Sequence, residues 1–206
     1  ALKQLENFKD LEKLVKIAEP VVFNVDPTQP GLIHQKVQGQ RSWLGRGTTE
    51  PSLEPIDVAF PLMHGSHGED GTLQGLLEMA DLPYVGSGVL ASALAMDKIL
   101  AKRVLHSAGI PVIDDLYVSR TRWQSEPDAV IAEAKSRFGY PVYVKPVTLG
   151  SSIGVSQAKD ASALRFALDV AATYDNRLMI EPAQQNIIEV NCSVLGDSID
   201  AQASVC

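Results

Sequence analysis

The strongest constraint on the fold of this chain is a junction at which an apolar run passes through a glycine-rich turn into a helical pattern. The run "IDVAFPLM" at 56–63 predicts a buried strand, and "GTLQGLLEMA" at 71–80 predicts a helix. Between them, "HGSHGEDG" at 64–71 holds two histidines and two adjacent acids. A connection that only turns the chain needs a glycine or two and polar residues. The sequence therefore predicts imidazole and carboxylate groups where a strand ends and a helix begins.

Strands and helices alternate in the first half of the chain, which predicts a parallel sheet covered by helices. An amphipathic helix is expected at 1–16, a strand at 20–26, a short strand at 83–86 and one long helix at 88–109. The stretch 31–55 has a weak pattern and is expected to be irregular. This half is therefore expected to be of the α/β class.

The pattern changes after Pro111, and the second half predicts an α+β unit. A strand is expected at 141–147, and a Gly/Ser turn that runs into another strand is expected at 150–158. The connection "TLGSS" is too short for a parallel crossover, so the two strands should pair antiparallel. The linker between the halves is expected at Gly109 to Pro111. The other elements expected here are strands at 112–119, 177–182 and 187–196 and helices at 126–139 and 160–174, the last capped by Asp160 or Ser162.

Composition argues against several classes of protein. Of the 206 residues 45% are hydrophobic, the net charge is -7, and no basic run occurs, which argues against a nucleic-acid partner. No apolar stretch approaches the ~20 residues that cross a bilayer, so no membrane partner is expected. The two cysteines, Cys192 and Cys206, are too few for a disulfide framework and favour the cytoplasm. Because the chain lacks an initial Met and ends in the strand-like "IDAQASVC", both ends are expected to be truncated.

Several charged and glycine-rich positions could carry chemistry. Lys145 precedes a "GSSIG" turn at 150–154, whose amides and hydroxyls could hold an anion beside the lysine. The alternative is a glycine hairpin with an exposed lysine. Lys98 lies on the long helix, where a solvated lysine is the ordinary interpretation. Glu181 ends a strand and could bind a nucleotide or face water, and Glu189 lies on a polar strand face that fits either solvent or the floor of a cleft.

The turn at 64–71 has two interpretations. His64 and His67 are three residues apart, and with Glu69 and Asp70 they could form a metal site. The intervening glycines favour a loop, and no cysteine or third histidine supports a metal. A glycine-rich path into a helix N-terminus is a natural anion site. A carboxylate substrate beside His64 suits that geometry better than a metal.

In their order and spacing, these signals resemble the D-alanine–D-alanine ligase family, a branch of the ATP-grasp enzymes. "HGSHGEDGTLQG" matches the family signature H-G-x-x-G-E-D-G-x-[aliphatic]-Q-G at every fixed position. "LPYVGSGVLASALAMDK", "AGIP", "YPVYVKPVTLGSSIGVS" and "NCSVLG" follow in family order. The resemblance implies an N-terminal parallel-sheet (pre-ATP-grasp) domain at 1–96, a central ATP-grasp subdomain at 97–183 and the start of a C-terminal ATP-grasp subdomain at 184–206.

The activity that this resemblance implies is ATP-dependent ligation of two D-alanines through an acyl phosphate, for peptidoglycan synthesis. The alternatives are a D-alanine–D-lactate or D-alanine–D-serine ligase, or a nucleotide-binding relative without catalysis. A homodimer is also implied. The Mg²⁺ ligands and a glycine-rich loop that grips the substrate amine are expected outside the segment, the former beyond Cys206. The segment alone is therefore expected to be inactive.

The resemblance also implies residue roles. His64 and Ser151 are expected to act at the D-alanine site, whereas Glu69 and Asp70 are expected to set the turn and cap the helix. Ile188 stands where members usually carry arginine. The implied ATP-binding residues are Lys98 and Lys145 for the phosphates, Gly150, Ser151 and Ser152 in a phosphate lid, Glu181, Pro182 and Ala183 for adenine, and Glu189 for the ribose.

Overall fold

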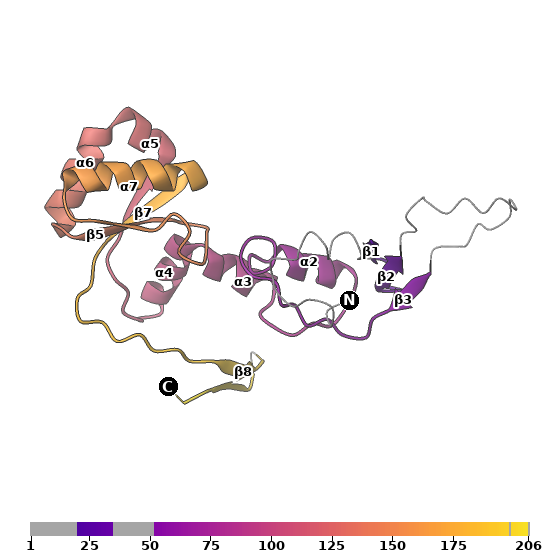
Figure 1. Cartoon of the computed structure of the whole chain (residues 1–206). Coiled ribbons are helices and arrows are strands. Elements are labelled where there is room, and N and C mark those ends of the chain that lie inside the picture. Colours follow the sequence, from indigo (N-terminus) through magenta and orange to yellow (C-terminus); the bar gives the residue numbers. More distant parts are fainter. Residues whose placement is uncertain (1–19, 35–51, 198, 206) are drawn as a thin grey trace, which may run out of the picture. The chain divides into compact units, whose positions relative to one another are not determined.

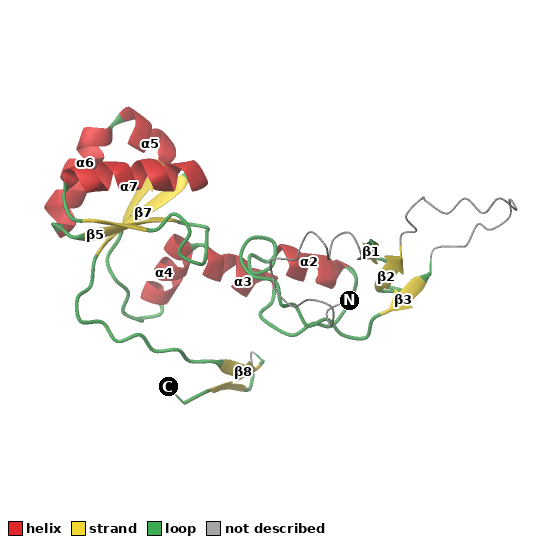
Figure 2. Cartoon of the chain, in the orientation of Figure 1, coloured by secondary structure: helices red, strands yellow, loops and turns green. Residues whose placement is uncertain are grey.

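The structure, a computed structural model, describes residues 20–34, 52–197 and 199–205 (Figure 1). The helix expected at 1–16 lies outside the described residues. By their internal contacts, the residues form two compact units. The first unit comprises Ala1–Val104 with Thr148–Ser151, and the second comprises Leu105–Val147 with Ser152–Cys206. The mixed class of helices and strands expected from the sequence is confirmed (Figure 2). The parallel sheet expected in the first half is represented among the described residues by one bridge, and the sheet described there is antiparallel.

The first unit contains a three-stranded antiparallel sheet in the order β1-β2-β3. Strand β1 (Val21–Asn24) confirms the strand expected at 20–26. Strands β2 (Gly31–His34) and β3 (Leu53–Pro55) fall within the stretch expected to be irregular, so that prediction was wrong at both of its ends. Each strand is only three or four residues long, too short for an alternation pattern to stand out from its surroundings.

The run 56–63 does not form the buried strand that its apolar composition predicts. Its one pairing among the described residues is a parallel bridge from Ala59 to Tyr84. The side chains of Val58, Phe60 and Leu62 are exposed. Parallel pairing between the two predicted runs is therefore present, but only at a single point. A buried parallel strand needs hydrogen-bonded neighbours and helices on both faces, and its own sequence supplies neither.

Three helices follow in the first unit: α2 (Thr72–Met79), α3 (Val89–Met96) and α4 (Lys98–Ser107). Helix α2 confirms its prediction, and its Leu77 packs with Ala80 and Leu82 in a small core. The single helix expected at 88–109 is two helices, because Asp97 between them adopts an extended conformation with ψ of 99°. The Asp97 carboxylate accepts hydrogen bonds from the amides of Ile99 and Leu100, so it caps the second helix.

The second unit is a four-stranded antiparallel sheet in the order β4-β7-β5-β6, with three helices packed on it (Figure 1). The strands are β4 (Leu116–Ser119), β5 (Val142–Pro146), β6 (Ser156–Ala158) and β7 (Arg177–Pro182). The helices are α5 (Arg120–Ser125), α6 (Pro127–Phe138) and α7 (Ala161–Tyr174). The expected β5–β6 antiparallel pair is confirmed, with Val142 opposite Ala158.

Alternate residues of the strands build the core of this unit. Val142 and Val144 of β5 are fully buried. Tyr143 and Lys145, which alternate with them along the strand, lie on the other face and are partly exposed. From the helix side, Leu164 and Leu168 of α7 are also fully buried. Helix α7 begins at the expected cap, because the Asp160 carboxylate accepts the amide of Ala163 at 2.8 Å. The sheet therefore holds one polar face away from its core, and Lys145 lies on it.

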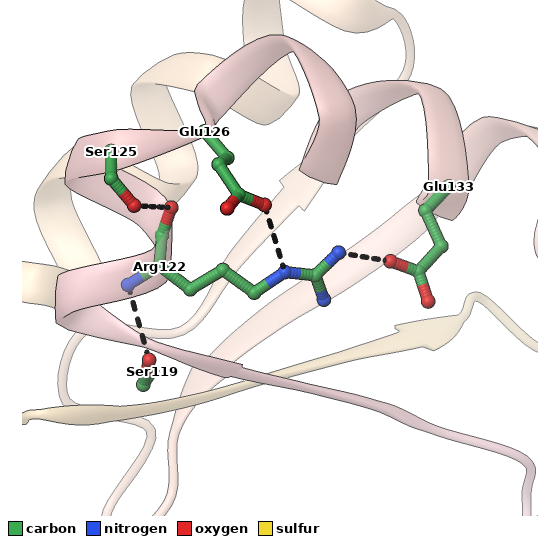
Figure 3. Close-up of polar contacts among 5 residues, drawn as sticks. All are labelled: Ser119, Arg122, Ser125, Glu126 and Glu133. Atoms are coloured by element: carbon green, nitrogen blue, oxygen red, sulfur yellow. Dashed lines mark hydrogen bonds and ion pairs between the residues drawn. The ribbon is translucent and has the colours of Figure 1, made fainter.

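Helix α5 was not expected from the sequence, and the strand predicted at 112–119 is confined to its last four residues. The Ser119 hydroxyl caps α5 by accepting the Arg122 amide at 3.1 Å (Figure 3). The Arg122 guanidinium then reaches Glu133 at 2.5 Å and Glu126 at 3.8 Å (Figure 3). This network ties α5 to α6. It has a structural role, and none of its residues is among those singled out as functional.

A two-stranded hairpin of β8 (Val194–Gly196) and β9 (Ala201–Ala203) ends the described chain. The strand expected at 187–196 forms only over its last three residues. Glu189 therefore lies in an exposed extended segment and not on a strand face. None of the described helices has the length and apolar character needed to cross a membrane.

Candidate functional site

The turn at 64–71 is closed by its own acidic side chains. Glu69 accepts a hydrogen bond from the Gly65 amide at 2.5 Å. Asp70 accepts the amide of His67 at 2.9 Å and that of Thr72 at 3.0 Å. The acids therefore set the turn, as expected, and Asp70 also accepts the amide of the first residue of α2. Buried Gln74 of α2 completes the turn by donating to the Gly68 carbonyl at 2.9 Å.

Two glycines of this turn are required by the path of the backbone. A Cβ on Gly68 would lie 2.6 Å from the Met63 Cβ, closer than side-chain carbons approach. Gly71 has a φ of +90° and would place a Cβ 2.8 Å from the Val89 carbonyl at the start of α3. Any larger residue would push these segments apart. The glycines therefore let the turn fold tightly against Met63 and the start of α3.

The electrostatics of the turn favour ionised Asp70. Donation from the His67 amide, followed by the Thr72 hydroxyl and amide, lowers the pKa of Asp70 from 3.8 to about 2. Hydrogen bonds to a carboxylate stabilise its charged form. Asp70 is therefore an anion across the physiological pH range, held in place by the backbone.

A cavity of about 320 Å³ opens beside the turn, entirely within the first unit. One part of its wall is polar, with His64, Glu69 and Gln74. The other part is built of small residues and apolar side chains. That size suits a small molecule. The residues that line it are Pro61, Leu62, Met63, His64, Gly68, Glu69, Gln74, Val85, Gly86, Ser87, Ala91, Ser92 and Ala95.

Lys98 is the first residue of α4, and Asp97 before it caps the helix. Its ammonium group donates to the carbonyl of Leu149, a residue 51 positions away in the sequence. The solvated-lysine interpretation of Lys98 was therefore wrong, because its ammonium is partly buried against the segment Thr148–Ser151. The contact brings a cation to the beginning of the glycine- and serine-rich loop.

Lys145 of β5 forms an ion pair with Glu181 of β7 on the polar face of the sheet. The register places Glu181 opposite Tyr143, one diagonal step from Lys145. The Lys145 ammonium also lies 5.7 Å from the centroid of the Tyr143 ring. Glu181 is 7% exposed. The interpretation of Glu181 as a strand-end residue that faces water was therefore wrong. A buried carboxylate needs such a partner, since an unpaired one is strongly disfavoured.

The loop after β5 has an unusual backbone. Ser151 and Ser152 have φ angles of 50° and 56°, in the left-handed region that residues other than glycine seldom occupy. Both side chains are exposed, and Gly150 beside them is partly buried. Consecutive left-handed residues turn neighbouring amides in a similar direction, which suits an anion. The loop therefore combines exposed hydroxyls with a constrained backbone.

The expected site residues fall into local groups. His64 lies beside Glu69, Lys98 beside Leu149, and Lys145 beside Glu181. At the end of β7, Pro182 pairs with Val142, and the Ala183 amide donates to the Pro141 carbonyl. Three further residues of this region, Gln74, Asp97 and Ser92, were not predicted from the sequence. The aspartate immediately before Lys98 was a readable cap signal, and Gln74 is a fixed position of the signature at 64–75, whereas the burial of Ser92 had no local signature.

Within the described residues, no group of three or more His, Cys, Asp or Glu side chains is arranged to hold a metal ion. His67 in particular donates its amide to Asp70 as part of the turn. The turn at 64–71 therefore supplies hydrogen-bonding groups to the cavity, and no metal is assigned to it.

Comparison with known proteins connects both units to one family. The family described as "D-ala D-ala ligase N-terminus" matches residues 3–87, and "D-ala D-ala ligase C-terminus" matches residues 104–206. A D-alanine–D-alanine ligase from Heliobacterium modesticaldum is 45% identical over 177 residues, covering 86% of this chain and 45% of that protein. The chain thus spans about half the length of the curated relatives it matches.

Two solved structures have a similar fold. The D-alanine–D-alanine ligase from Coxiella burnetii is 34% identical with a TM-score of 0.71, over 94% of this chain and 52% of that one. The VanG D-Ala:D-Ser ligase from Enterococcus faecalis is 28% identical with a TM-score of 0.71, over 94% of this chain and 51% of that one. These similarities show that the chain has a fold of the ATP-grasp class. Within that class, the chain belongs to the D-alanine–D-alanine ligase family.

Proposed function

We propose that the protein carrying this chain ligates two D-alanines at the expense of ATP, forming D-alanyl-D-alanine for peptidoglycan. The observation that carries this proposal is the turn at 64–71, which presents His64 to a cavity of small-molecule size. The family match and relatives named D-alanine–D-alanine ligase support the same reaction. The first D-alanine is bound at His64 and Ser151 in this proposal.

The same proposal assigns residues of this chain to the binding of ATP. Lys98 and Lys145 supply two ammonium groups for phosphates, and the loop of Gly150, Ser151 and Ser152 supplies amides and hydroxyls. Glu181, Pro182 and Ala183 hold adenine at the end of β7, and Glu189 holds the ribose. ATP, when bound, supplies the phosphoryl group that converts the D-alanine carboxylate to an acyl phosphate.

The chemical task of these residues is charge control. A phosphate must approach a carboxylate, and both are anions. Lysine ammonium groups and oriented amides that are fixed in advance stabilise the charge that develops in the transition state, without reorganising during the reaction. The contacts of Lys98 with Leu149 and of Lys145 with Glu181 hold both cations in defined positions. Because the described residues contain no metal-binding cluster, none of them is assigned to Mg²⁺.

The remaining assignments belong to the same proposal. We assign residues 1–96 to a substrate domain, 97–183 to a central ATP-grasp subdomain and 184–206 to the start of a C-terminal one. The protein is proposed to act in the cytoplasm as a homodimer, on small molecules and without a nucleic-acid or membrane partner. The net charge of -7 supports the absence of a nucleic-acid partner.

A second candidate differs only in the second substrate. The similarity to the D-Ala:D-Ser ligase favours D-alanine–D-serine ligation as the alternative. The two activities are distinguished by measuring phosphate release from the complete protein. The assay uses ATP with D-alanine alone, and then with D-serine or D-lactate added. We expect release with D-alanine alone and D-alanyl-D-alanine as the product. A protein that releases no phosphate with any of these substrates would overturn the ligase proposal.

The role of Lys145 is tested by Lys145→Met, with the exposed Lys135→Met on α6 as the matched control. Loss of a hydrogen bond to a charged group is worth about 1.5–3 kcal/mol, so the KM for ATP should rise ~10-fold or more. The control should leave the KM for ATP unchanged. Equal KM values in the two variants would remove Lys145 from the nucleotide site.

A further inference from the structure

The two oxygens of the Glu69 carboxylate face different groups, one the backbone and the other His64. One oxygen, Oε2, accepts the Gly65 amide at 2.5 Å. The other, Oε1, lies 3.8 Å from Nδ1 of His64. Because a carboxylate is planar, anchoring one oxygen to the backbone also fixes the direction of the other. Glu69 therefore does more than close the turn, since its second oxygen faces the imidazole.

The imidazole itself has little else to hold it. The His64 side chain is 85% exposed, whereas the Glu69 side chain is 51% exposed and tied to the backbone. An exposed side chain samples several rotamers, and fixing one costs conformational entropy. A fixed carboxylate oxygen 3.8 Å from Nδ1 favours the ring orientation in which this nitrogen faces Glu69. The other nitrogen, Nε2, is then the one that can meet a substrate.

Both side chains line the same cavity, together with small residues such as Gly86 and Ala91. We propose that Glu69 is a positioning residue, which holds the His64 ring in one orientation at the D-alanine site. This inference rests on the proposed function. It separates the two acids of the turn: Asp70 fixes the backbone and the start of α2, whereas Glu69 acts on substrate through His64.

The proposal is tested in the complete protein with Glu69→Gln, which keeps an oxygen to accept the Gly65 amide but removes the charge facing His64. The matched control is Glu78→Gln on α2, whose carboxylate accepts the Tyr84 hydroxyl at 2.9 Å and lies outside the cavity. His64→Ala and the double variant Glu69→Gln/His64→Ala complete a double-mutant cycle. The measurements are kcat and KM for D-alanine, with the melting temperature of each variant.

We expect Glu69→Gln to raise the KM for D-alanine about 5-fold, the upper range for an exposed ion pair, with kcat and melting temperature nearly unchanged. In the His64→Ala background the same substitution should have no further effect, because its target is gone. Glu78→Gln should match the unsubstituted protein in every measurement.

Two results would overturn the inference. One is an effect of Glu69→Gln that persists in full in the His64→Ala background. The other is a fall in kcat and melting temperature with an unchanged KM, which indicates a purely structural role. Neither result bears on the ligase activity, which is judged separately by whether the unsubstituted protein releases phosphate with D-alanine.

Discussion

At the scale of single residues, several carboxylates of the described residues fix the backbone. Asp70, Asp97 and Asp160 each accept amide hydrogen bonds at the start of a helix. Glu181 acts differently, since it is buried and paired with a lysine side chain. Capping aspartates are local features that the sequence reveals. The partner of Glu181 lies 36 positions away and depends on strand register.

Asp70 gives a prediction about pH. Its pKa is about 2 in the folded protein and 3.8 ordinarily, so the fold prefers the ionised form. The stabilisation is complete above the ordinary pKa and is lost as the pH falls from about 4 towards 2. We expect Asp70→Asn to weaken the fall in melting temperature over this window. Glu78→Gln serves as the control. An identical acid dependence in Asp70→Asn and the unsubstituted protein would contradict the prediction.

At the scale of elements, the second unit depends on the contact between α7 and the sheet. Leu164 and Leu168 on the inner face of α7 are fully buried, and Val144 and Ile180 are buried from the side of the sheet. On the outer face of the same helix, Phe166 is 69% exposed. The helix therefore provides a direct comparison between buried and exposed apolar side chains.

Truncation of these two side chains should have very different effects. Leu168→Ala removes fully buried methyl groups and should lower the free energy of unfolding by ~3 kcal/mol. Phe166→Ala removes a larger but exposed ring and should change it by less than about 0.5 kcal/mol. Urea unfolding of both variants measures the difference. Similar losses in the two variants would contradict the packing of α7 described above.

At the scale of the whole molecule, the chain carries parts of both regions that define its family. The N-terminal family region matches residues 3–87 and the C-terminal one matches residues 104–206. The relatives from Heliobacterium modesticaldum and Acetivibrio thermocellus are about twice as long as the matched region. A ligation of two substrates at the expense of a nucleotide needs every binding group in place at once.

This leads to a prediction about the 206 residues by themselves. We expect them to show no D-alanine-dependent release of ADP, because the amine-binding loop and the Mg²⁺ ligands that the family resemblance implies are expected elsewhere. The complete protein, assayed under the same conditions, is the positive control. D-alanine-dependent ADP release by the 206 residues alone would contradict the prediction.

The sequence by itself determined the features that depend on neighbouring residues. The turn at 64–71, helix α2, the β5–β6 pair and a cap of α7 at Asp160 or Ser162 were all predicted, because caps, glycine turns and short connections act over a few positions. The structure selects Asp160 as the cap. The family resemblance also rested on such local motifs.

Tertiary structure decided the rest. The helix expected at 88–109 is interrupted at Asp97, and the run 56–63 forms a single bridge. Strands β2 and β3 form in a stretch with little sequence pattern. The tertiary structure also buried Glu181 against Lys145 and placed Lys98 against Leu149. These outcomes depend on partners distant in the sequence. A single chain segment encodes its own periodicity but not the register or the neighbours that determine its burial.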